Sequence, residues 1–354
     1  MRSIHDVTLD FRRDDRPRKW TLLLGENGVG KSTLLRAIAL VFAGSDARPA
    51  ILGDPSSWVS NGRKRCVIRA EFETSSGGFR SVSLSISRHD STGAVLKKNS
   101  RALAVLDKTL RHAERNYLVI GYGASRHLPA EKASVKPTSE FLDRRAACVA
   151  TLFSRNASLN PLATWAMDQE YRGEKRGAEL VRRTLDSLLP GVTFARVDRK
   201  GRRLLFKTPD GLTPLELLSD GYQNVAAWCG DLLFRITEAF VNYKNPLDAR
   251  ALLLIDEIDL HLHPLWQRQL RTYLNEQFPN LQIVATTHSP LTAQQSSIGE
   301  VFLVGRPRTT GAPTVEQYLG DPEKLMVHQI LLSPLFGLRT LDSEVVEGIK
   351  KEYS

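Results

Sequence analysis

Short apolar runs alternate with helical patterns along most of the chain. Two runs, 20–24 and 252–255, have the length and the continuous apolar character of strands that are buried on both faces. Leu, Ile and aromatic residues recur at helical spacing over 31–43, 222–240 and 265–278. Because strands that alternate with helices usually pair in parallel and are covered on both faces, the pattern predicts an α/β fold with a parallel-rich sheet flanked by helices.

Further strands and hairpins are expected around these elements. Alternating or short apolar patterns predict strands at 7–11, 66–72, 79–86, 117–121, 192–197, 203–207, 283–286 and 301–304. Gly-containing turns join 66–72 to 79–86 and 192–197 to 203–207, so each pair is expected to form a hairpin. A Gly-, Pro- and Ser-rich stretch at 44–62 is expected to interrupt the regular structure.

The elements suggest four consecutive segments. Residues 1–123 are interpreted as the N-terminal half of a core with an antiparallel hairpin, and 124–200 as a mainly helical, basic insertion or lid. Residues 201–310 supply the C-terminal half of the core, and 311–354 a C-terminal helical segment. The chain has no apolar run long enough to cross a membrane and no apolar signal segment at its start, so a cytoplasmic protein without a membrane part is expected.

The net charge of +10 is unevenly distributed. Segment 60–115 has 12 basic and five acidic residues and 144–203 has 13 and six, whereas 204–354 has 12 and 18. A basic middle of this kind suits a surface that meets a polyanion such as DNA. The alternative is a solvated basic surface without such a partner, and the basic residues are not interleaved with the aromatic residues of a single-strand stacking platform.

A glycine-rich segment between a predicted strand and a predicted helix matches G-x-x-x-x-G-K-[ST] in full. In a P-loop the backbone N–H groups face phosphate oxygens, the lysine compensates the β- and γ-phosphates, and the serine hydroxyl ligates Mg²⁺. The context predicts a site for ATP and Mg²⁺. Its residues are Gly25, Glu26, Asn27, Gly28, Val29, Gly30, Lys31, Ser32 and Thr33.

Two carboxylates follow the apolar strand at 252–255. Asp256 is placed to hold Mg²⁺ together with Ser32, and Glu257 is placed to polarise a water for attack on the γ-phosphate. The pair could be chance acids at a strand end, but the complete P-loop upstream makes them candidates for a metal ligand and a catalytic base.

Two further motifs resemble those of ABC-type ATPases. Residues 218–223 read Leu-Ser-Asp-Gly-Tyr-Gln and resemble the signature motif, with a substitution and an insertion relative to the usual pattern. The resemblance implies that Ser219 and Gly221 contact the nucleotide held by a second subunit. His288, after the strand at 283–286, matches the switch histidine of that class and is a second candidate for a catalytic residue.

Three segments are similar to a narrower group, the AAA-like ATPases of bacterial defence. Residues 257–264 resemble the group's D-loop, which adds Asp259 to the expected nucleotide-binding residues, and 122–126 resemble its Tyr-Gly-x-x-Arg segment. Residues 329–338 resemble a C-terminal segment of the Septu-like members. The group includes the Septu and retron-associated ATPases and the OLD nucleases, whose Toprim domain is not found here. Arg12 and Arg13 remain candidates for contacts on the adenine side.

The leading interpretation is an ATP-hydrolysing protein that closes as a head-to-tail homodimer over two Mg-ATP. The resemblance implies that such a dimer controls a separate effector, expected to be a nuclease, in antiviral defence. A RecF-like DNA-binding repair ATPase, whose basic middle grips DNA, is the alternative. The ATP-binding subunit of a membrane transporter is a third reading, which the departure from Leu-Ser-Gly-Gly-Gln disfavours.

Overall fold

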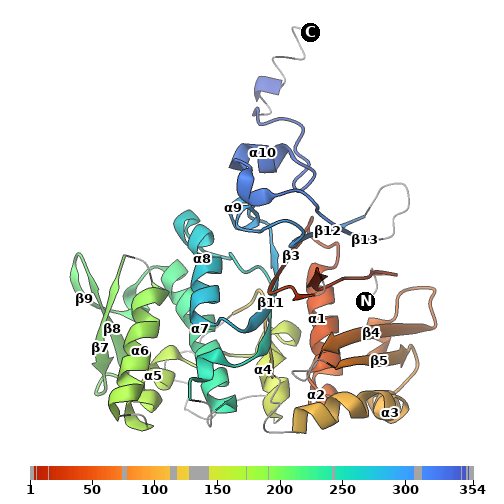
Figure 1. Ribbon diagram of the computed structural model, residues 1–354, viewed down its shortest axis with the longest axis horizontal. Coiled ribbons are helices and arrows are strands. Elements are labelled where there is room, and N and C mark those ends of the chain that lie inside the picture. The colour runs from red at the N-terminus through yellow and green to blue at the C-terminus, as the bar shows by residue number, and fades with distance from the viewer. Residues whose placement is uncertain are drawn as a thin grey trace.

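A six-stranded sheet forms the centre of the protein (Figure 1). The computed structural model describes residues 4–350 except 5, 15, 74–77, 112–117, 127–142, 173, 190, 241–243, 307–312, 344 and 348–349. The strand order is β13-β12-β3-β11-β10-β6, and every neighbouring pair is parallel except β12 and β13. The strands are β3 (Trp20–Leu24), β6 (Leu118–Tyr122), β10 (Ala251–Ile255), β11 (Leu281–Thr287), β12 (Val301–Gly305) and β13 (Thr314–Gln317). The predicted fold class is confirmed.

The continuous apolar runs arise because both faces of the sheet are buried. Along β10, Leu253 and Ile255 pack into one hydrophobic core, while Leu252 and Leu254 pack into a second core on the other face. A strand with one solvated face would alternate apolar and polar residues, which these strands do not. The two cores therefore account for the sequence pattern that predicted the sheet.

Helices cover each face. The first core is filled from α5 (Leu162–Arg172), α6 (Glu174–Leu188), α7 (Asp220–Ala239) and α8 (Pro264–Gln277). The second is filled from α1 (Lys31–Phe42), α2 (Arg48–Leu52), α3 (Thr92–Arg111) and α4 (Arg144–Phe153). The short helices α9 (Pro290–Gln294) and α10 (Val327–Leu332) follow, and Figure 1 shows the C-terminal segment projecting away from the sheet.

Two small antiparallel sheets flank the central one, as both hairpin predictions required. Strand β4 (Arg65–Glu73) pairs with β5 (Phe79–Ser87) on the side of α3. Strands β7 (Thr193–Asp198) and β8 (Arg203–Thr208) form the second hairpin, and β9 (Gly211–Pro214) adds a third strand that the sequence did not predict. Figure 1 places these two sheets at opposite ends of the molecule.

In the N-terminal half, one strand prediction was wrong and one helix was not predicted. Residues 7–11 form no strand; the short pair β1 (Arg12–Arg13) and β2 (Arg16–Pro17) follows them instead. Helix α3, 20 residues long, occupies a region for which no helix was predicted. The proposed insertion at 124–200 contributes α4, α5, α6 and β7, and its residues 127–142 lie outside the described residues, so its boundaries stay a prediction.

A buried polar network ties α7 to the sheet. The Asp231 carboxylate, fully buried, accepts hydrogen bonds from Tyr122 Oη on β6 (2.8 Å) and from Arg235 Nε one turn along α7 (2.6 Å). Its other oxygen accepts from Asn160 Nδ2 at 2.6 Å. Because a buried carboxylate is stable only when it is paired and hydrogen-bonded, the network fixes how α7 sits on the sheet. None of the described helices is both long enough and apolar enough to span a membrane.

Candidate nucleotide-binding site

The candidate residues meet at the carboxyl edge of the parallel sheet. The P-loop follows β3, Asp256 and Glu257 follow β10, and His288 follows β11, which lies between the other two strands. The register aligns Ile255 with Ala285 and Leu24 with Thr287, so the three strands end side by side. Ligands of open α/β sheets bind at this edge.

The P-loop has a backbone that requires glycine at two points. Gly25 has φ 154°, and a Cβ there would lie 2.0 Å from the Val304 carbonyl oxygen of β12, so no side chain fits. Gly30 has φ 111° and precedes α1 as its N-cap without a side-chain capping bond. Because glycine has no side chain that could cap them, the N–H groups at the start of α1 remain for a ligand, which is the arrangement that binds phosphate at a helix N-terminus.

The side chain of Lys31 is fixed by hydrogen bonds to the backbone of the P-loop. Its side chain is only 6% exposed, and Nζ donates to the carbonyl oxygens of Gly25 (2.7 Å) and Glu26 (2.8 Å). Burial lowers the pKa of Lys31, while the nearby carboxylates Asp256 and Glu257 oppose that shift. The Lys31 cation and the two strand-end acids are therefore close enough to interact electrostatically, and we treat them as one cluster.

A threonine of the neighbouring strand orients the two acids. Thr286 Oγ1 donates to Asp256 Oδ1 at 2.7 Å and accepts from the Glu257 N–H at 2.7 Å. Glu257 has φ 48°, in the left-handed region that costs a non-glycine residue about 1–2 kcal/mol. Such a conformation persists only when its surroundings impose it, and the Thr286 hydroxyl is one of the groups that do so.

Arg126 is the second support of this strand end. Its guanidinium, 7% exposed, donates to the backbone oxygens of Gly123 (3.0 Å), Asp256 (2.6 Å) and Glu257. Burial lowers the pKa of Arg126 to about 10, against the opposing charges of Asp256, Asp259 and Glu257, so the group stays cationic at neutral pH. Arg126 therefore acts on both acids through their backbone.

His288 and Asp259 complete the cluster. His288 lies at the end of β11, where more than a third of it is exposed. Its partial burial and the charge of Lys31 lower its pKa, whereas the three acids Glu257, Asp259 and Asp256 oppose this shift. Asp259 accepts a hydrogen bond from the Thr287 hydroxyl, and burial raises its pKa. A mainly neutral histidine beside a lysine is suited to donating a hydrogen bond to an anion.

The signature-like segment lies beside this cluster and does not join it. Ser219 is exposed as the N-cap of α7 and its hydroxyl makes no capping bond. Gly221 faces the D-loop, where a Cβ would lie 2.9 Å from the His261 carbonyl oxygen. Among the described residues, no hydrogen bond connects Ser219 or Gly221 to the P-loop of the same chain.

The residues present fit a magnesium nucleotide. The uncapped helix start, the cradle at Gly25 and the buried Lys31 provide donors and positive charge for phosphates. The Ser32 hydroxyl and the Asp256 carboxylate are hard oxygen ligands of the kind Mg²⁺ prefers. His263 caps α8 through Nδ1, which accepts a hydrogen bond from the Leu265 N–H. The described residues contain no cluster of three or more His, Cys, Asp or Glu that could hold another metal ion.

Sequence reasoning missed Thr286 and gave Arg126 no specific contribution. The available signal was a pair of threonines ending an otherwise apolar strand directly before His288. The suggested adenine-side contacts of Arg12 and Arg13 stay a prediction, which the position of Arg13 does not favour. Arg13 lies beside Trp20 at the start of β3, whereas the P-loop follows the opposite end of that strand.

Comparison with known families agrees with this geometry. Residues 114–293, just over half of the chain, match the family described as "AAA domain, putative AbiEii toxin, Type IV TA system". Residues 1–122 match a second family described as "AAA domain". The chain belongs to the AAA-domain family.

The relatives of this AAA-domain protein include a Septu protein and a retron probable ATPase. It is 29% identical to the Septu protein PtuA of Bacillus mycoides over 95% of this chain and 43% of that protein. It is 31% identical to the Retron Ec83 probable ATPase of Escherichia coli over 42% of this chain and 27% of that protein. The resemblance inferred from the sequence is thereby confirmed, and the chain spans less than half the length of these two relatives.

Among solved structures, the SMC head domain from Thermotoga maritima matches with a TM-score of 0.43 and 16% identity, over 84% of this chain and 89% of that chain. The fold assignment rests on the strand order described above and not on this likeness.

Proposed function

We propose that the protein binds ATP with Mg²⁺ at the carboxyl edge of its sheet and hydrolyses it. The proposal rests on one observation: the candidate residues come together from the ends of three adjacent parallel strands, β3, β11 and β10. A P-loop lysine, two strand-end carboxylates and an exposed histidine interact electrostatically there. Cation, metal ligand and base are the groups that phosphoryl transfer to water requires.

Each residue has a task that follows from its position. Lys31 and the N–H groups at the start of α1 compensate phosphate charge. Ser32 and Asp256 would hold Mg²⁺, which when bound withdraws charge from phosphate oxygens. Glu257, whose backbone is fixed by Thr286 and Arg126, would accept the proton of the attacking water.

Ser219 supports a second part of the proposal, closure of a head-to-tail homodimer over two Mg-ATP. The Ser219 hydroxyl is exposed and free of a capping bond, and the described hydrogen bonds do not direct it to its own P-loop. A hydroxyl at an exposed helix N-terminus is able to bind the phosphate of a nucleotide held by another subunit.

The similarity to Septu and retron proteins supports the third part of the proposal, that the protein controls a separate effector. Because the chain is similar to a Septu protein and to a retron probable ATPase, we propose that the dimer regulates a partner, expected to be a nuclease, in antiviral defence. Co-purification of the chain with the product of a neighbouring gene, with and without ATP, tests this part alone.

The Glu257→Gln variant tests the hydrolysis proposal. Glutamine keeps the size and backbone of the residue but cannot accept a proton, so phosphate release should fall by about 100-fold or more. ATP affinity, measured by calorimetry, should stay within a few-fold of the unchanged protein. Glu276→Gln on α8 is the matched control, since this acid lies on the exposed side of a helix outside the site. Full turnover by Glu257→Gln would show that another group is the base.

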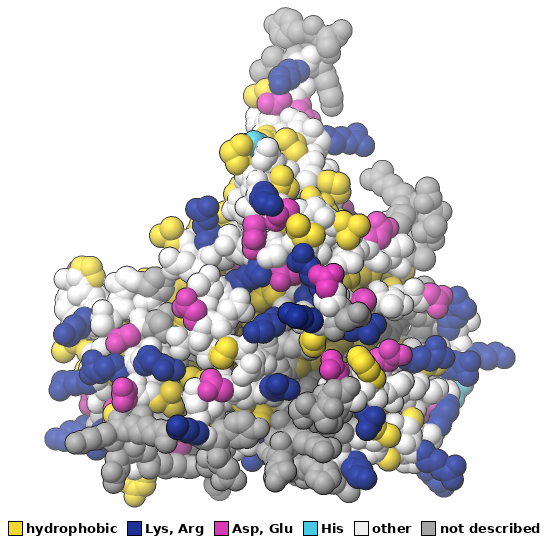
Figure 2. Space-filling view, viewed as in Figure 1, with side chains coloured by type: hydrophobic (Ala, Val, Ile, Leu, Met, Phe, Trp, Pro, Cys, Tyr) yellow, Lys and Arg dark blue, Asp and Glu magenta, His cyan; other side chains and the backbone are white. Residues whose placement is uncertain are grey.

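A specific surface favours a second candidate function, a RecF-like ATPase that contacts DNA. Exposed Lys97 and Arg101 on α3 and Arg65 and Arg69 on β4 belong to one end of the molecule, where Figure 2 shows Lys and Arg side chains projecting. In the other basic segment, Arg199 pairs with Glu170 (3.3 Å) and Arg203 with Asp198 (3.7 Å), so part of that charge is compensated. This makes the α3 end the better candidate.

Fluorescence anisotropy with duplex DNA at two salt concentrations separates the two functions. Binding through phosphate contacts should weaken by about 0.9 log units per log unit of salt for each phosphate neutralised. Lys97→Glu with Arg101→Glu should then lower the affinity. A flat titration with and without ATP would leave the protein effector as the better candidate partner.

A further inference from the structure

A cleft of about 770 Å³ opens at the amino edge of the sheet, at the opposite end of β3 from the P-loop. Its lining includes Trp20, the first residue of β3, whereas the P-loop begins after Leu24, the last. Five strand residues at about 3.3 Å each put roughly 16 Å between the two ends. The cleft is thus separate from the candidate nucleotide site, and its volume lies in the usual range for small-molecule sites.

The lining is strongly cationic. It has two carboxylates, Asp14 and Glu300, and five basic side chains: Arg13, Arg16, Arg18, Lys19 and Arg271. Figure 2 shows Lys and Arg side chains near the middle of this face, where Figure 1 has the β1–β2 hairpin. The cleft therefore carries an excess of three positive charges.

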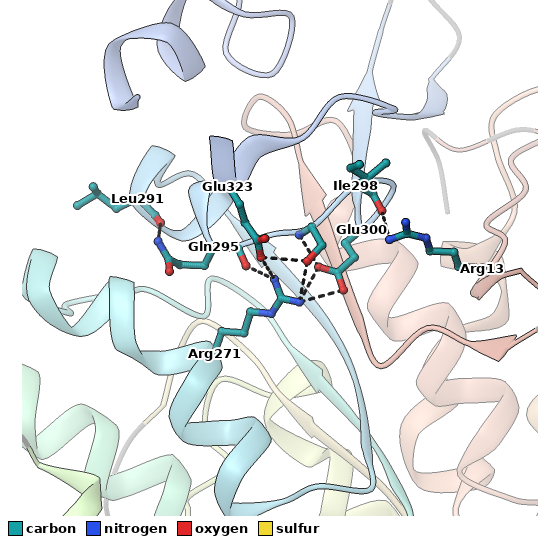
Figure 3. A network of polar contacts seen from close by, with 8 residues as sticks. Arg13, Arg271, Leu291, Gln295, Ile298, Glu300 and Glu323 are labelled. Atoms are coloured by element: carbon teal, nitrogen blue, oxygen red, sulfur yellow. Dashed lines mark hydrogen bonds and ion pairs between the residues drawn. The ribbon is translucent and has the colours of Figure 1, made fainter. Parts of the chain in front are cut away.

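Both carboxylates are already paired. Glu300 accepts from Arg271 (3.0 Å), which also bonds Glu323 (3.1 Å), and Figure 3 shows Arg271 between these two acids. Asp14 lies 3.7 Å from Arg13, whose Nη1 also donates to the Ile298 carbonyl oxygen (Figure 3). Both carboxylates of the lining therefore already have an arginine as ion-pair partner.

Among the described residues, Arg16, Arg18 and Lys19 form no ion pair within 4 Å, although the charges of Asp10 and Glu300 act on Arg18. Lys19 donates to the Pro279 carbonyl oxygen, and Arg18 to those of Asp10 and Arg12, all of them neutral acceptors. The uncompensated charge is therefore concentrated on one chain segment, directly before β3.

Two buried donors of the lining also lack acceptors. Arg18 Nε and Trp20 Nε1 have no hydrogen-bond partner among the described residues, and their side chains are 6% and 2% exposed. Both atoms can only donate, so what they lack is an acceptor. Unpaired buried donors are costly, and two of those found among the described residues belong to the lining of this cationic cleft.

We propose that this cleft is a second anion site, specific for a small phosphorylated molecule. The excess positive charge favours an anion, and the unpaired donors favour a ligand that brings acceptor oxygens. Four of the five cations are arginines, whose planar guanidinium groups match the geometry of phosphate oxygens. The site is independent of the proposed ATP hydrolysis and binds its ligand at the opposite edge of the sheet.

Calorimetry with inorganic tripolyphosphate tests the proposal in the Lys31→Ala variant, which removes the P-loop cation. We expect saturable binding of one tripolyphosphate per chain. Arg16→Glu with Lys19→Glu should weaken it by about tenfold or more, because charge-assisted hydrogen bonds contribute at least that factor. Both residues are exposed. Lys207→Glu on β8 with Arg268→Glu on α8, both exposed and outside the cleft lining, makes the same change in net charge elsewhere and should leave the affinity unchanged.

Two further measurements keep the test decisive. If the charge-reversed protein does not fold, Arg16→Gln with Lys19→Gln replaces it and should still lose about threefold or more in affinity. Citrate, a carboxylate anion of similar charge, should bind more weakly than tripolyphosphate. Absence of saturable binding, an equal loss in the Lys207→Glu/Arg268→Glu control, or citrate binding as tight as tripolyphosphate would each overturn the proposal.

Discussion

Replacing Thr286 by valine should damage both stability and catalysis, although Thr286 is predicted to touch no substrate. The hydroxyl is fully buried, donates to the Asp256 carboxylate and accepts from the Glu257 N–H, at 2.7 Å each. The bond to the carboxylate contributes about 1.5–3 kcal/mol, and an unsatisfied buried N–H costs about 1–3 kcal/mol. The added methyl group returns roughly 0.8 kcal/mol, so the free energy of unfolding should fall by about 2–5 kcal/mol.

The same change should slow ATP hydrolysis by about 10- to 100-fold, because it releases a metal ligand and the candidate base from their fixed orientation. Urea unfolding measures the first effect and phosphate release the second. Thr286→Ser is the matched control, since it keeps the hydroxyl and loses only a methyl group, about 0.8 kcal/mol. A valine variant as stable and active as the unchanged protein would refute the reasoning. A serine variant as impaired as valine would show that the methyl group, and not the hydroxyl, is responsible.

Three other substitutions have defined outcomes. Lys31→Ala should weaken ATP binding by on the order of 100-fold in calorimetry, because the loop loses its cation; an affinity within about twofold of wild type would contradict this. Ser219→Arg should leave the ATP affinity of the monomer unchanged and prevent ATP-dependent dimerisation, measured by light scattering; a full dimer would exclude the signature contact in trans. Because the folded pKa of His288 is lowered by burial and by Lys31, the folded state binds fewer protons than the unfolded state below about pH 6.5. Its contribution to stability is therefore present at pH 7.5 and is lost as the pH falls towards 5.5. The difference in free energy of unfolding between wild type and His288→Gln, measured with urea, should narrow or reverse as the pH falls over that range. A difference that stays constant would exclude the effect.

The sequence predicted the sheet and the motifs because those features are local. Continuous apolar runs reflect burial on both faces, and the P-loop requires glycine at fixed positions. The prediction at 7–11 was right about the side chains and wrong about the backbone. Val7, Leu9 and Phe11 all pack against the second core, but the described structure gives this segment no strand to pair with. Alternation identifies a buried face and not the hydrogen-bond partner.

Helix α3 was missed for a different reason. Its inner side is made by Val95, Leu103 and Leu106 together with Asn99, which is 4% exposed. Asn99 Oδ1 accepts from the Ser85 N–H of β5 (2.7 Å), and Nδ2 donates to the Ser85 carbonyl oxygen (2.8 Å). An asparagine in the middle of the apolar stripe hides the helical period, and only the position of β5 explains why it is buried.

The contributions of Thr286 and Arg126 depend on tertiary structure in the same way. Neither residue belongs to the P-loop or to the strand-end acids, and each acts on Asp256 and Glu257 from another strand or loop. Arg126 follows β6 and Thr286 is part of β11, the two neighbours of β10. The sequence could supply the acids, but only the strand order shows which residues hold them.

The contacts of Lys31 show how this loop can serve both structure and binding. An ammonium group has three N–H donors, and two of them are used by the Gly25 and Glu26 carbonyl oxygens. These two bonds fix Nζ within the loop, so little side-chain entropy remains to be lost when a phosphate binds. The third donor and the full positive charge remain for the ligand, since neutral carbonyl groups do not compensate charge. Asp256 and Glu257 help to keep the buried amine protonated against the effect of burial on its pKa. The acids assigned to the metal and to the base thus also maintain the cation that binds the phosphates, which couples the three residues before any nucleotide arrives.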